Sequence, residues 1–368
     1  GRERALEQLK LGLELAQWPQ ERGILMTGLR GVGKTVMLNQ AEDLALSAGW
    51  DVVSETSSKG FFERIVSVHL PEILNRLDPG PSFQVTQFSA AGLGSITIQY
   101  PDGREESPTF RTMVSKILDL KGYSGGLLFS IDEVNEASAD EFAVFAGEYQ
   151  HLIREDQEVA FVGAGVQGEV RHLLSQRSAT FLRRCVNVEL GILTYGQVFE
   201  AFQRPIVSRG RTASDAVLDH MSRASQGYPF LVQSIGDLAW RNTPDNHEIS
   251  MDDARYGHRM ARRSMGSFIH EPALSGLSPK DRSFLVAMAY DDGASKIEDI
   301  RQRMGGVKSG YASMYRERLL GSGLIEVAGH GLVTISFPYL RDYLRTHIVT
   351  EAAHDSPRED FPPPPELD

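Results

Sequence analysis

The chain has 368 residues, of which 41% are hydrophobic and 24% charged, a composition typical of a globular protein with two or three domains. Its formal net charge of −11 argues against a protein coated in nucleic acid, although a local basic face stays compatible with it. The chain has a single cysteine, Cys185, which excludes an internal disulfide. It contains no run of 18 apolar residues, the length needed to cross a membrane. We therefore expect a cytoplasmic protein with no membrane partner.

The pattern of the first residues, "GRERALEQLKLGLELA", predicts a charged amphipathic helix. A strand at 23–28, a glycine-rich loop at 28–35 and a second helix are expected to follow it. The loop matches G-x-x-x-x-G-K-[ST], in which glycines let the backbone approach an anion, the lysine reaches phosphates and the threonine binds Mg²⁺. An ordinary glycine-rich turn is the alternative, but it leaves the flanking strand and helix without a role. We predict ATP or ADP with Mg²⁺ as cofactors, held by Gly28, Leu29, Arg30, Gly31, Val32, Gly33, Lys34 and Thr35.

Short apolar strands alternate with helical patterns up to residue 193, which predicts a parallel sheet covered by helices. Residues 79–108 interrupt this alternation, because "SITIQY" alternates by twos and is followed by Pro-Asp-Gly. We interpret them as a β-hairpin insertion or a partly mobile loop. The strands of the sheet are expected at 23–28, 51–56, 126–133, 159–165 and 185–190.

Two carboxylates, Asp132 and Glu133, end the apolar segment "GLLFSIDE". Because parallel strands end at one crevice, this pair is expected beside the glycine-rich loop. Asp132 would hold the Mg²⁺ bound to Thr35, and Glu133 would be the catalytic residue that orients the attacking water. The alternative is a strand that runs into an acidic turn.

The following segment contains weaker signals. Residues 163–165, Gly-Ala-Gly, are interpreted as a close-packed turn, and Gln167 is the nearest polar candidate to sense a γ-phosphate. Arg183 and Arg184 end a helix just before an edge-type strand, where a guanidinium could stabilise charge on a transferring phosphoryl group. Alternatively, the two arginines only balance a helix C-terminus.

The pattern from residue 194 to about 265 is helical only, and "SQGYPF" interrupts it most clearly. Residues 275–350 contain three helical patterns and a hairpin around Gly329-His330-Gly331, which predicts a winged helix-turn-helix. Ten Lys and Arg against eight Asp and Glu give this segment a net charge of only +2, so duplex DNA and a protein partner stay open. The third helix carries the candidate DNA contacts Lys308, Ser309, Tyr311 and Arg316, with Ser313, Tyr315 and Arg318 beside them.

The chain resembles AAA+ ATPases of the initiator (origin-recognition) clade, particularly bacterial stand-alone AAA ATPases. The resemblance rests on segments that occur in one order: Gly1-Arg2-Glu3, the glycine-rich loop, "LLFSIDE", "FVGAG", the helix-final Arg184, "GYPFLVQSIGDLAW" and the terminal winged-helix pattern. The resemblance covers about residues 1–349. It implies that Arg2 lies against the adenine and ribose. It also implies that the helices after residue 194 form a lid, that the chain assembles as a homo-oligomer on binding ATP, and that Arg184 faces the neighbour's nucleotide.

The lid departs from that clade, because Phe230 stands where an arginine that touches the γ-phosphate is usual. Gly227-Tyr228-Pro229-Phe230 resembles instead the lid of STAND signalling ATPases, whose proline, here Pro229, packs near the base. This resemblance implies slow or partner-stimulated hydrolysis.

The expected fold class is therefore α/β, a P-loop NTPase (AAA+) parallel sheet with a helical lid and a C-terminal winged helix. We expect an ATPase that couples nucleotide state to assembly and to engagement of DNA or a partner. The alternative is a STAND-type signalling or defence switch with slow hydrolysis and a protein-docking winged helix. The expected divisions are 1–193 for the nucleotide-binding domain, 194–268 for the lid and linker helix, 269–350 for the winged helix and 351–368 for a disordered tail.

Overall fold

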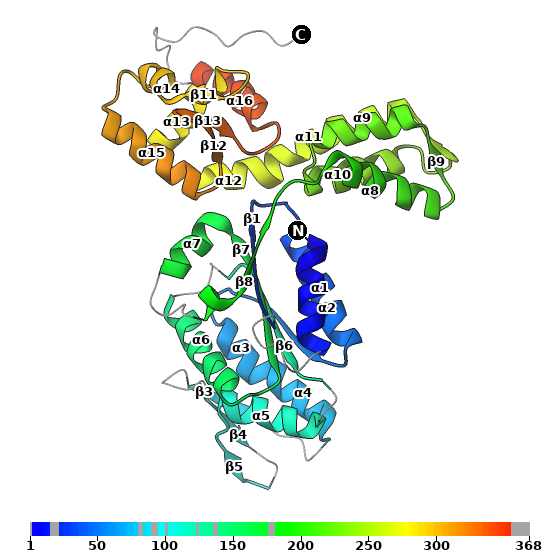
Figure 1. The fold of residues 1–368 in the computed structure, drawn as a ribbon, viewed down its shortest axis with the longest axis vertical. Coiled ribbons are helices and arrows are strands. Elements are labelled where there is room, and N and C mark those ends of the chain that lie inside the picture. The colour runs from blue at the N-terminus through cyan, green and yellow to red at the C-terminus, as the bar shows by residue number, and fades with distance from the viewer. Residues whose placement is uncertain are drawn as a thin grey trace. The chain divides into compact units, whose positions relative to one another are not determined.

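The computed structural model describes residues 2–14, 22–79, 84–89, 95–99, 102–122, 125–134, 139–175 and 181–354. The chain divides into two compact units, which are described in turn (Figure 1). The first unit comprises Gly1–Gly28 and Gly33–Leu190, and the second comprises Leu29–Val32 and Gly191–Asp368. In the described ranges, no helix is both long and apolar enough to cross a membrane.

The first unit is built on a five-stranded sheet in the order β2-β6-β7-β1-β8, with all neighbours parallel. All five predicted strands are confirmed to within one residue at each end. Because β1 lies between two other strands, the loop that follows it starts from the interior of the sheet. The strands are β1 (Gly23–Gly28), β2 (Asp51–Thr56), β6 (Leu127–Asp132), β7 (Val159–Val166) and β8 (Val186–Leu190).

Helices cover both faces of this sheet, with α1 and α2 on one side and α3 and α6 on the other (Figure 1). Side chains alternate between the faces of a strand, so neighbouring residues of β6 serve different cores. Phe129 and Ile131 join an aromatic-rich core with α3, α5 and α6. The helices are α1 (Arg2–Glu14), α2 (Lys34–Ser47), α3 (Phe61–Arg64), the π-helix η2 (Ile65–His69), α4 (Leu70–Leu77), α5 (Phe110–Lys121), α6 (Ala139–Arg154) and α7 (Gln167–Ser175).

The segment predicted as an insertion contains β3 (Gln84–Ser89), β4 (Ser95–Gln99) and β5 (Glu105–Glu106). These strands pair antiparallel in the order β3-β4-β5, as expected for a hairpin with one further short strand. The turn between β4 and β5 includes Gly103, whose φ of 85° favours glycine. Residues 80–83, 90–94 and 100–101 lie outside the described part of the chain.

The predicted turn at residues 163–165 is wrong, because these residues continue β7. Gly163 pairs with Leu25 of β1 on one side and with Ile131 of β6 on the other. Close packing does require the glycine, since a Cβ there would lie 2.7 Å from Cζ of Phe161. The glycine therefore makes room for an aromatic ring inside a strand.

The second unit continues with α8 (Tyr195–Ser208), α9 (Asp215–Ser225), α10 (Pro229–Asn242) and α11 (Met251–Met265). Side-chain N-caps from Thr194, Ser214 and Ser250 start three of these helices, and Pro229 opens the fourth. The prediction of a purely helical segment is wrong in one detail: β9 (Thr212–Ala213) pairs with β10 (Glu248–Ile249). Two-residue strands are too short to leave a periodic signal.

Among the described residues, the rest of this unit holds five α-helices, one π-helix and a three-stranded sheet in the order β11-β13-β12. The expected hairpin is present as β12 and β13, while β11 was not predicted. The last helix continues to His354, past the predicted start of the tail, because Glu351, Ala352 and Ala353 favour helix. Residues 355–368 lie outside the described range. The elements are η5 (Gly266–His270), α12 (Glu271–Ser275), α13 (Pro279–Ala289), β11 (Ser295–Lys296), α14 (Ile297–Arg303), α15 (Ser309–Gly321), β12 (Ile325–Gly329), β13 (Leu332–Ile335) and α16 (Leu340–His354).

Candidate nucleotide site

The glycine-rich loop joins the end of β1 to the start of α2. Gly33 is the N-cap of α2 and has a φ of 90°, a left-handed conformation that favours glycine. It supplies no side-chain cap, and its carbonyl accepts the Met37 amide at 3.1 Å. The N-terminus of a helix carries unpaired amides and partial positive charge, which suits an anion.

Lys34 and Thr35 form the first turn of α2 and point to different partners. The side chain of Lys34 is buried, and its ammonium donates to the Gly28 carbonyl at 3.3 Å. Thr35 is exposed, and its Oγ1 donates to Oδ2 of Asp132 at 2.8 Å. The fold thus joins two residues 97 positions apart, which the convergence of parallel strand ends predicts. Hydroxyl and carboxylate oxygens are the ligands that Mg²⁺ prefers, so this pair fits a magnesium ion.

Glu133 directly follows β6 in an unusual backbone conformation. Its φ is 50°, a left-handed value that is uncommon outside glycine. Its amide donates to Oδ1 of Asp132 at 2.8 Å, and the next amide, Val134, donates to the Ala164 carbonyl on β7 at 2.9 Å. The turn therefore holds the Asp132 carboxylate in place through the Glu133 amide. The sequence did not predict this conformation. Such backbone outliers cluster at functional sites.

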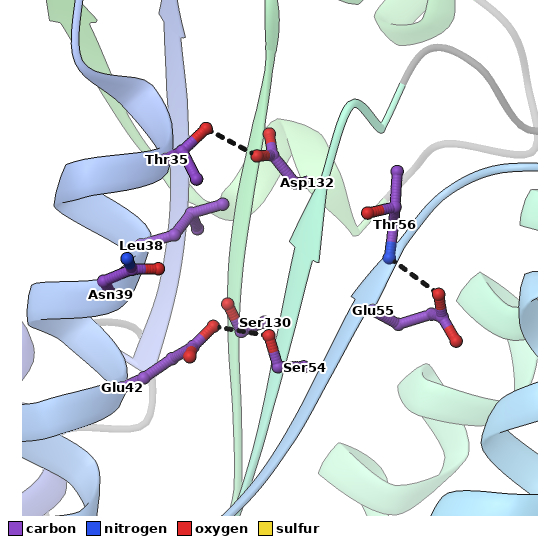
Figure 2. Close-up of a pocket in the computed structure, with 9 residues that line it drawn as sticks. All are labelled: Thr35, Leu38, Asn39, Glu42, Ser54, Glu55, Thr56, Ser130 and Asp132. Atoms are coloured by element: carbon purple, nitrogen blue, oxygen red, sulfur yellow. Dashed lines mark hydrogen bonds between the residues drawn. The ribbon is translucent and has the colours of Figure 1, made fainter.

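A cleft of about 230 Å³ adjoins Thr35 and Asp132 on the side of the sheet that α2 covers. We call it the α2 cleft; its lining residues are Thr35, Leu38, Asn39, Glu42, Ser54, Glu55, Thr56, Ser130 and Asp132 (Figure 2). Ser54 Oγ donates to Glu42 at 2.8 Å across it. Of these nine, sequence reasoning selected only Thr35 and Asp132. The spacing of Thr35, Asn39 and Glu42 on one face of a helix was the signal that could have extended the set.

Glu55 lines the α2 cleft but is held by basic residues outside it. Arg64 donates to both of its oxygens, at 2.9 and 3.0 Å, and a ring nitrogen of His69 lies 3.2 Å from Oε2. Burial alone would raise the pKa of Glu55, but these hydrogen bonds and the Thr56 amide hold it below its ordinary value. Glu55 is therefore a charged group that is already neutralised by its neighbours.

The central loop residues Leu29–Val32 belong to the second unit, where they contact the start of α10. The Phe230 amide donates to the Gly31 carbonyl at 3.1 Å, and the Tyr228 hydroxyl donates to the Arg30 carbonyl. A Cβ at Gly31 would lie 3.2 Å from Cε1 of Tyr228. The structure thus places both neighbours of the half-buried Pro229 against this loop. Tyr228, which sequence reasoning named only within its motif, makes the hydroxyl contact, and burial raises its pKa.

The two arginines before β8 differ in their surroundings. Both lie in a short 3₁₀ helix, η4 (Leu182–Arg184), directly before the edge strand β8. Nε of Arg183 donates to the Leu174 carbonyl at 2.7 Å. The Arg184 side chain is exposed and has no ion-pair or hydrogen-bond partner among the described residues. Arg184 is therefore the more available of the two.

Two further candidates from the first unit have structural contacts. Arg2 begins α1, which packs against α2, and burial lowers the pKa of its guanidinium. Gln167, the weak candidate sensor, begins α7, and its Nε2 donates to Oε1 of Glu189 on β8 at 2.8 Å.

The candidate DNA contacts on α15 divide into exposed and buried residues. Lys308, Ser309 and Tyr311 are exposed and Arg316 is half-buried, so they stay available. The adjacent residue Ser313 is also exposed. Tyr315, named beside these candidates, is only 8% exposed and packs inward together with Ala312 and Leu319 at helical spacing, so it is not available on the surface. Arg318 is tied to Oδ1 of Asp281 at 2.7 Å.

Comparisons with known proteins support this fold. A family model described as "Domain of unknown function (DUF8462)" matches residues 267–344, and a search of the curated proteins found no match. A Walker-type ATPase of Pyrococcus abyssi has a TM-score of 0.65 at 15% identity, covering 94% of this chain and 95% of that one. The ORC2 protein of Aeropyrum pernix, in ADPNP and ADP complexes, has a TM-score of 0.57 at 14% identity, with 96% and 93% covered. The chain thus has the α/β P-loop fold of AAA+ ATPases.

Proposed function

We propose that the chain binds ATP with Mg²⁺ at residues 28–35 and hydrolyses it to ADP and phosphate. The observation that carries the proposal is the 2.8 Å hydrogen bond between Thr35 and Asp132, which unites the end of β6 with the glycine-rich loop. A bare glycine-rich turn would not need a carboxylate at this place.

The roles follow from the chemistry of each group. Amides of the loop and the start of α2 would bind phosphate oxygens, and the Lys34 ammonium would add a point charge. Thr35 and Asp132 would hold Mg²⁺, which neutralises charge that develops on the phosphates. Glu133 follows Asp132 in a fixed turn, so its carboxylate is a suitable group to orient the attacking water. We place Arg2 and Pro229 near the adenine by resemblance.

Lys34→Ala tests the binding half of this proposal. The variant removes the charge that phosphates attract, so affinity for a fluorescent ATP analogue is expected to fall by about 100-fold or more. Lys10→Ala is the matched control, because it removes the charge of an exposed lysine on α1 that lies outside the loop. Unchanged affinity in a folded Lys34→Ala protein would contradict the assignment.

We propose further that hydrolysis depends on assembly into a homo-oligomer, with Arg184 supplied to a neighbour's nucleotide. Arg183 is engaged by the Leu174 carbonyl, whereas the exposed Arg184 is not so engaged, and Phe230 leaves the chain's own lid without an arginine. An arginine supplied in this way can raise the hydrolysis rate by ~10³-fold or more. Turnover would then be slow in isolated chains and rise with protein concentration.

Mixing experiments separate a neighbour's arginine from a structural one. Arg184→Ala is expected to abolish the rise with concentration and to leave ATP affinity unchanged, and Arg183→Ala is expected to do less. Arg184→Ala chains mixed with Lys34→Ala chains should regain activity. At one kind of interface, the Arg184→Ala chain supplies an intact nucleotide site and the Lys34→Ala chain supplies the arginine. No recovery in chains that co-assemble would assign Arg184 a structural role.

For the C-terminal part of the second unit, we propose a winged helix that engages duplex DNA. Its helices α13, α14 and α15 and the hairpin β12–β13 follow one another in the order that this motif requires. Lys308, the N-cap of α15, and Arg316 on α15 are the basic residues best placed for phosphates. Arg301, Arg303 and Arg318 are instead paired with carboxylates.

A protein-docking role is the second candidate, and exposed apolar residues favour it. Tyr311 and Met314 on α15 are 55% and 40% exposed, and Val327 on β12 is 57% exposed. Exposed apolar side chains of this size are typical of surfaces that bind another protein. This reading corresponds to a STAND-type switch with slow hydrolysis.

Salt-dependent DNA binding decides between these two readings. If α15 binds phosphates, replacing Lys308 and Arg316 by Glu lowers affinity and reduces the slope of log affinity against log salt by about 2. Equal binding curves for the wild type and the double variant would favour the protein partner.

A further inference from the structure

We propose that Tyr228 is a positioning residue for the glycine-rich loop, whose hydroxyl holds the Arg30–Gly31 peptide so that the Gly31 amide faces the phosphates. The inference rests on the nucleotide site proposed above and assigns to it a residue from outside the loop. Tyr228 is the N-cap of α10 and lies 198 positions along the chain from Arg30. The motif of the loop contains no signal for it.

The Tyr228 hydroxyl is held in one direction by the packing of its ring. The residue is 0% exposed, and its hydroxyl donates to the Arg30 carbonyl. Its ring lies edge-to-face against that of Phe337, with the centroids 6.2 Å apart. A carbonyl can only accept a hydrogen bond, and burial raises the pKa of Tyr228, so the hydroxyl keeps the proton that it donates. One buried donor is therefore aimed at one carbonyl of the loop.

A donor that binds a carbonyl also sets the direction of the amide in the same peptide group. The group is planar and trans, so the carbonyl of Arg30 and the amide of Gly31 point in opposite directions. Because Tyr228 binds the carbonyl, the amide points away from Tyr228. The next carbonyl, that of Gly31, accepts the Phe230 amide at 3.1 Å. Two consecutive peptide groups of the loop are thus held through their carbonyls by the start of α10.

The backbone of the loop has a conformation that suits an anion. Gly31 and Gly33 have φ values of 75° and 90°, left-handed values that favour glycine. Consecutive amides around such residues form a concave nest that binds anions. Binding is tighter when the amides converge before the anion arrives, because ordering a loop during binding costs free energy. Tyr228 keeps one amide of this nest in place in advance.

Close packing of the loop makes the hydroxyl contact possible. A Cβ at Gly31 would lie 3.2 Å from Cε1 of Tyr228 and 3.1 Å from Cδ1 of Ile269, so only glycine allows this approach without a shift. Without the hydroxyl, the partly buried Arg30 carbonyl would lose this donor. An unpaired carbonyl is costly, so the peptide group would turn toward water and carry the Gly31 amide with it.

The Tyr228→Phe variant tests this role, with ATP and inorganic triphosphate as the two ligands. It keeps the ring and removes the hydroxyl, so affinity for ATP should fall about tenfold through the loss of one amide contact to phosphate. Triphosphate has no base or ribose, and competition with a fluorescent ATP analogue measures its affinity. Because Tyr228 acts on the loop, both ligands should weaken by the same factor. Weaker ATP binding with unchanged triphosphate binding would assign Tyr228 to the base and overturn the proposal.

Tyr339→Phe is the matched control for removal of a hydroxyl. Tyr339 is a half-buried tyrosine of the same unit, and its hydroxyl donates to the Ala224 carbonyl at 2.7 Å. The chemical change is the same but lies away from the loop, so both affinities should equal those of the wild type. An equal loss in Tyr339→Phe would mean that a missing hydroxyl acts through general stability, which would also overturn the proposal.

Phe337→Leu offers a second route if Tyr228→Phe does not fold. It removes the ring that holds Tyr228 and leaves the hydroxyl, so both affinities should fall together by about twofold to threefold. Wild-type affinities in folded Tyr228→Phe, or in folded Phe337→Leu where only that variant folds, would overturn the role of Tyr228. If Lys34→Ala still abolishes binding, the nucleotide site survives that result. A wild-type protein that binds neither ATP nor triphosphate would contradict the nucleotide site, and the role of Tyr228 with it.

Discussion

The two faces of the five-stranded sheet in the first unit differ in what they bury. On one face, Phe129, Phe145 and Phe161 are fully buried. The ring centroid of Phe145 lies 5.7 Å from that of Phe129 and 6.2 Å from that of Phe161. On the other, the same strands carry Ser130 and Asp132 toward α2 and leave a polar cleft. Strand β6 serves both faces, since Phe129 and Ser130 are adjacent.

One face of the sheet therefore stabilises the fold, and the other face carries the groups of the candidate site. The aromatic face removes large apolar surfaces from water and holds the strands in register. On the α2 face, Ser54, Ser130 and Asp132 line a cleft that leaves space and oxygen ligands near the strand ends. Variants that disturb one face and spare the other can test this division.

The largest stability effect is expected from Phe145→Ala on the aromatic face. Removal of a buried phenyl ring costs about 3–5 kcal/mol, because apolar contacts are lost and a cavity is left behind. Urea unfolding followed by near-ultraviolet circular dichroism would measure the free energy of unfolding of the first unit. Leu46→Ala, at a residue of α2 in the same unit that is 57% exposed, should change stability by less than ~0.5 kcal/mol. Equal effects of the two variants would remove the distinction. The rings that contact Phe145 are Phe61, Phe62, Phe110, Phe129, Phe142, Tyr149, Phe161 and Phe181.

A smaller destabilisation is expected from Gly163→Ala. The added methyl would lie 2.7 Å from Cζ of Phe161 and 3.0 Å from Val134, so the ring must move, at a cost of about 1–3 kcal/mol. Gly147→Ala is its matched control, because nothing lies within 4 Å of a Cβ there and the residue is inside α6. That change should stabilise the protein by ~0.5–1 kcal/mol. A stabilised Gly163→Ala protein would show that the aromatic face is looser than described.

The smallest effect is expected from Ser130→Ala on the opposite face. Its hydroxyl has no hydrogen-bond partner in the described residues, so its removal should change the free energy of unfolding by less than ~1 kcal/mol, with stabilisation the expected sign. Thr109→Ala removes a hydroxyl that does have a partner, the Thr112 amide at the start of α5, and should cost ~1 kcal/mol. A clear destabilisation by Ser130→Ala in metal-free buffer would mean that this serine supports the fold.

Much of this architecture follows from local sequence. The apolar strands and the glycine-rich loop have strong periodic or motif signals, and the rule that parallel strands end together places Asp132 beside Thr35. The conformation of Glu133 was not predictable, since nothing in the residue type demands a positive φ. Gly163 was interpreted as a turn because a glycine does not reveal that strands flank it on both sides.

Other differences arise from tertiary contacts that a pattern does not encode. Alternation along β6 places Ser130 and Asp132 on one face, but it does not tell which helix covers that face. The phase of α15 turns Tyr315 inward, and the position of Asp281 ties up Arg318, so both are less available than their residue types suggest. The contact of Tyr228 with Arg30 joins residues 198 positions apart and has no local signal.

The most direct test of the central claim, that the α2 face ends in an ATP-hydrolysing site, compares Glu133→Gln with the wild type. Phosphate release and binding of an ATP analogue would be measured on the same preparations. The variant keeps the shape of the side chain and loses the carboxylate that orients water, so release should fall by about 100-fold or more while binding stays within twofold. Wild-type phosphate release by a folded Glu133→Gln protein would contradict the account.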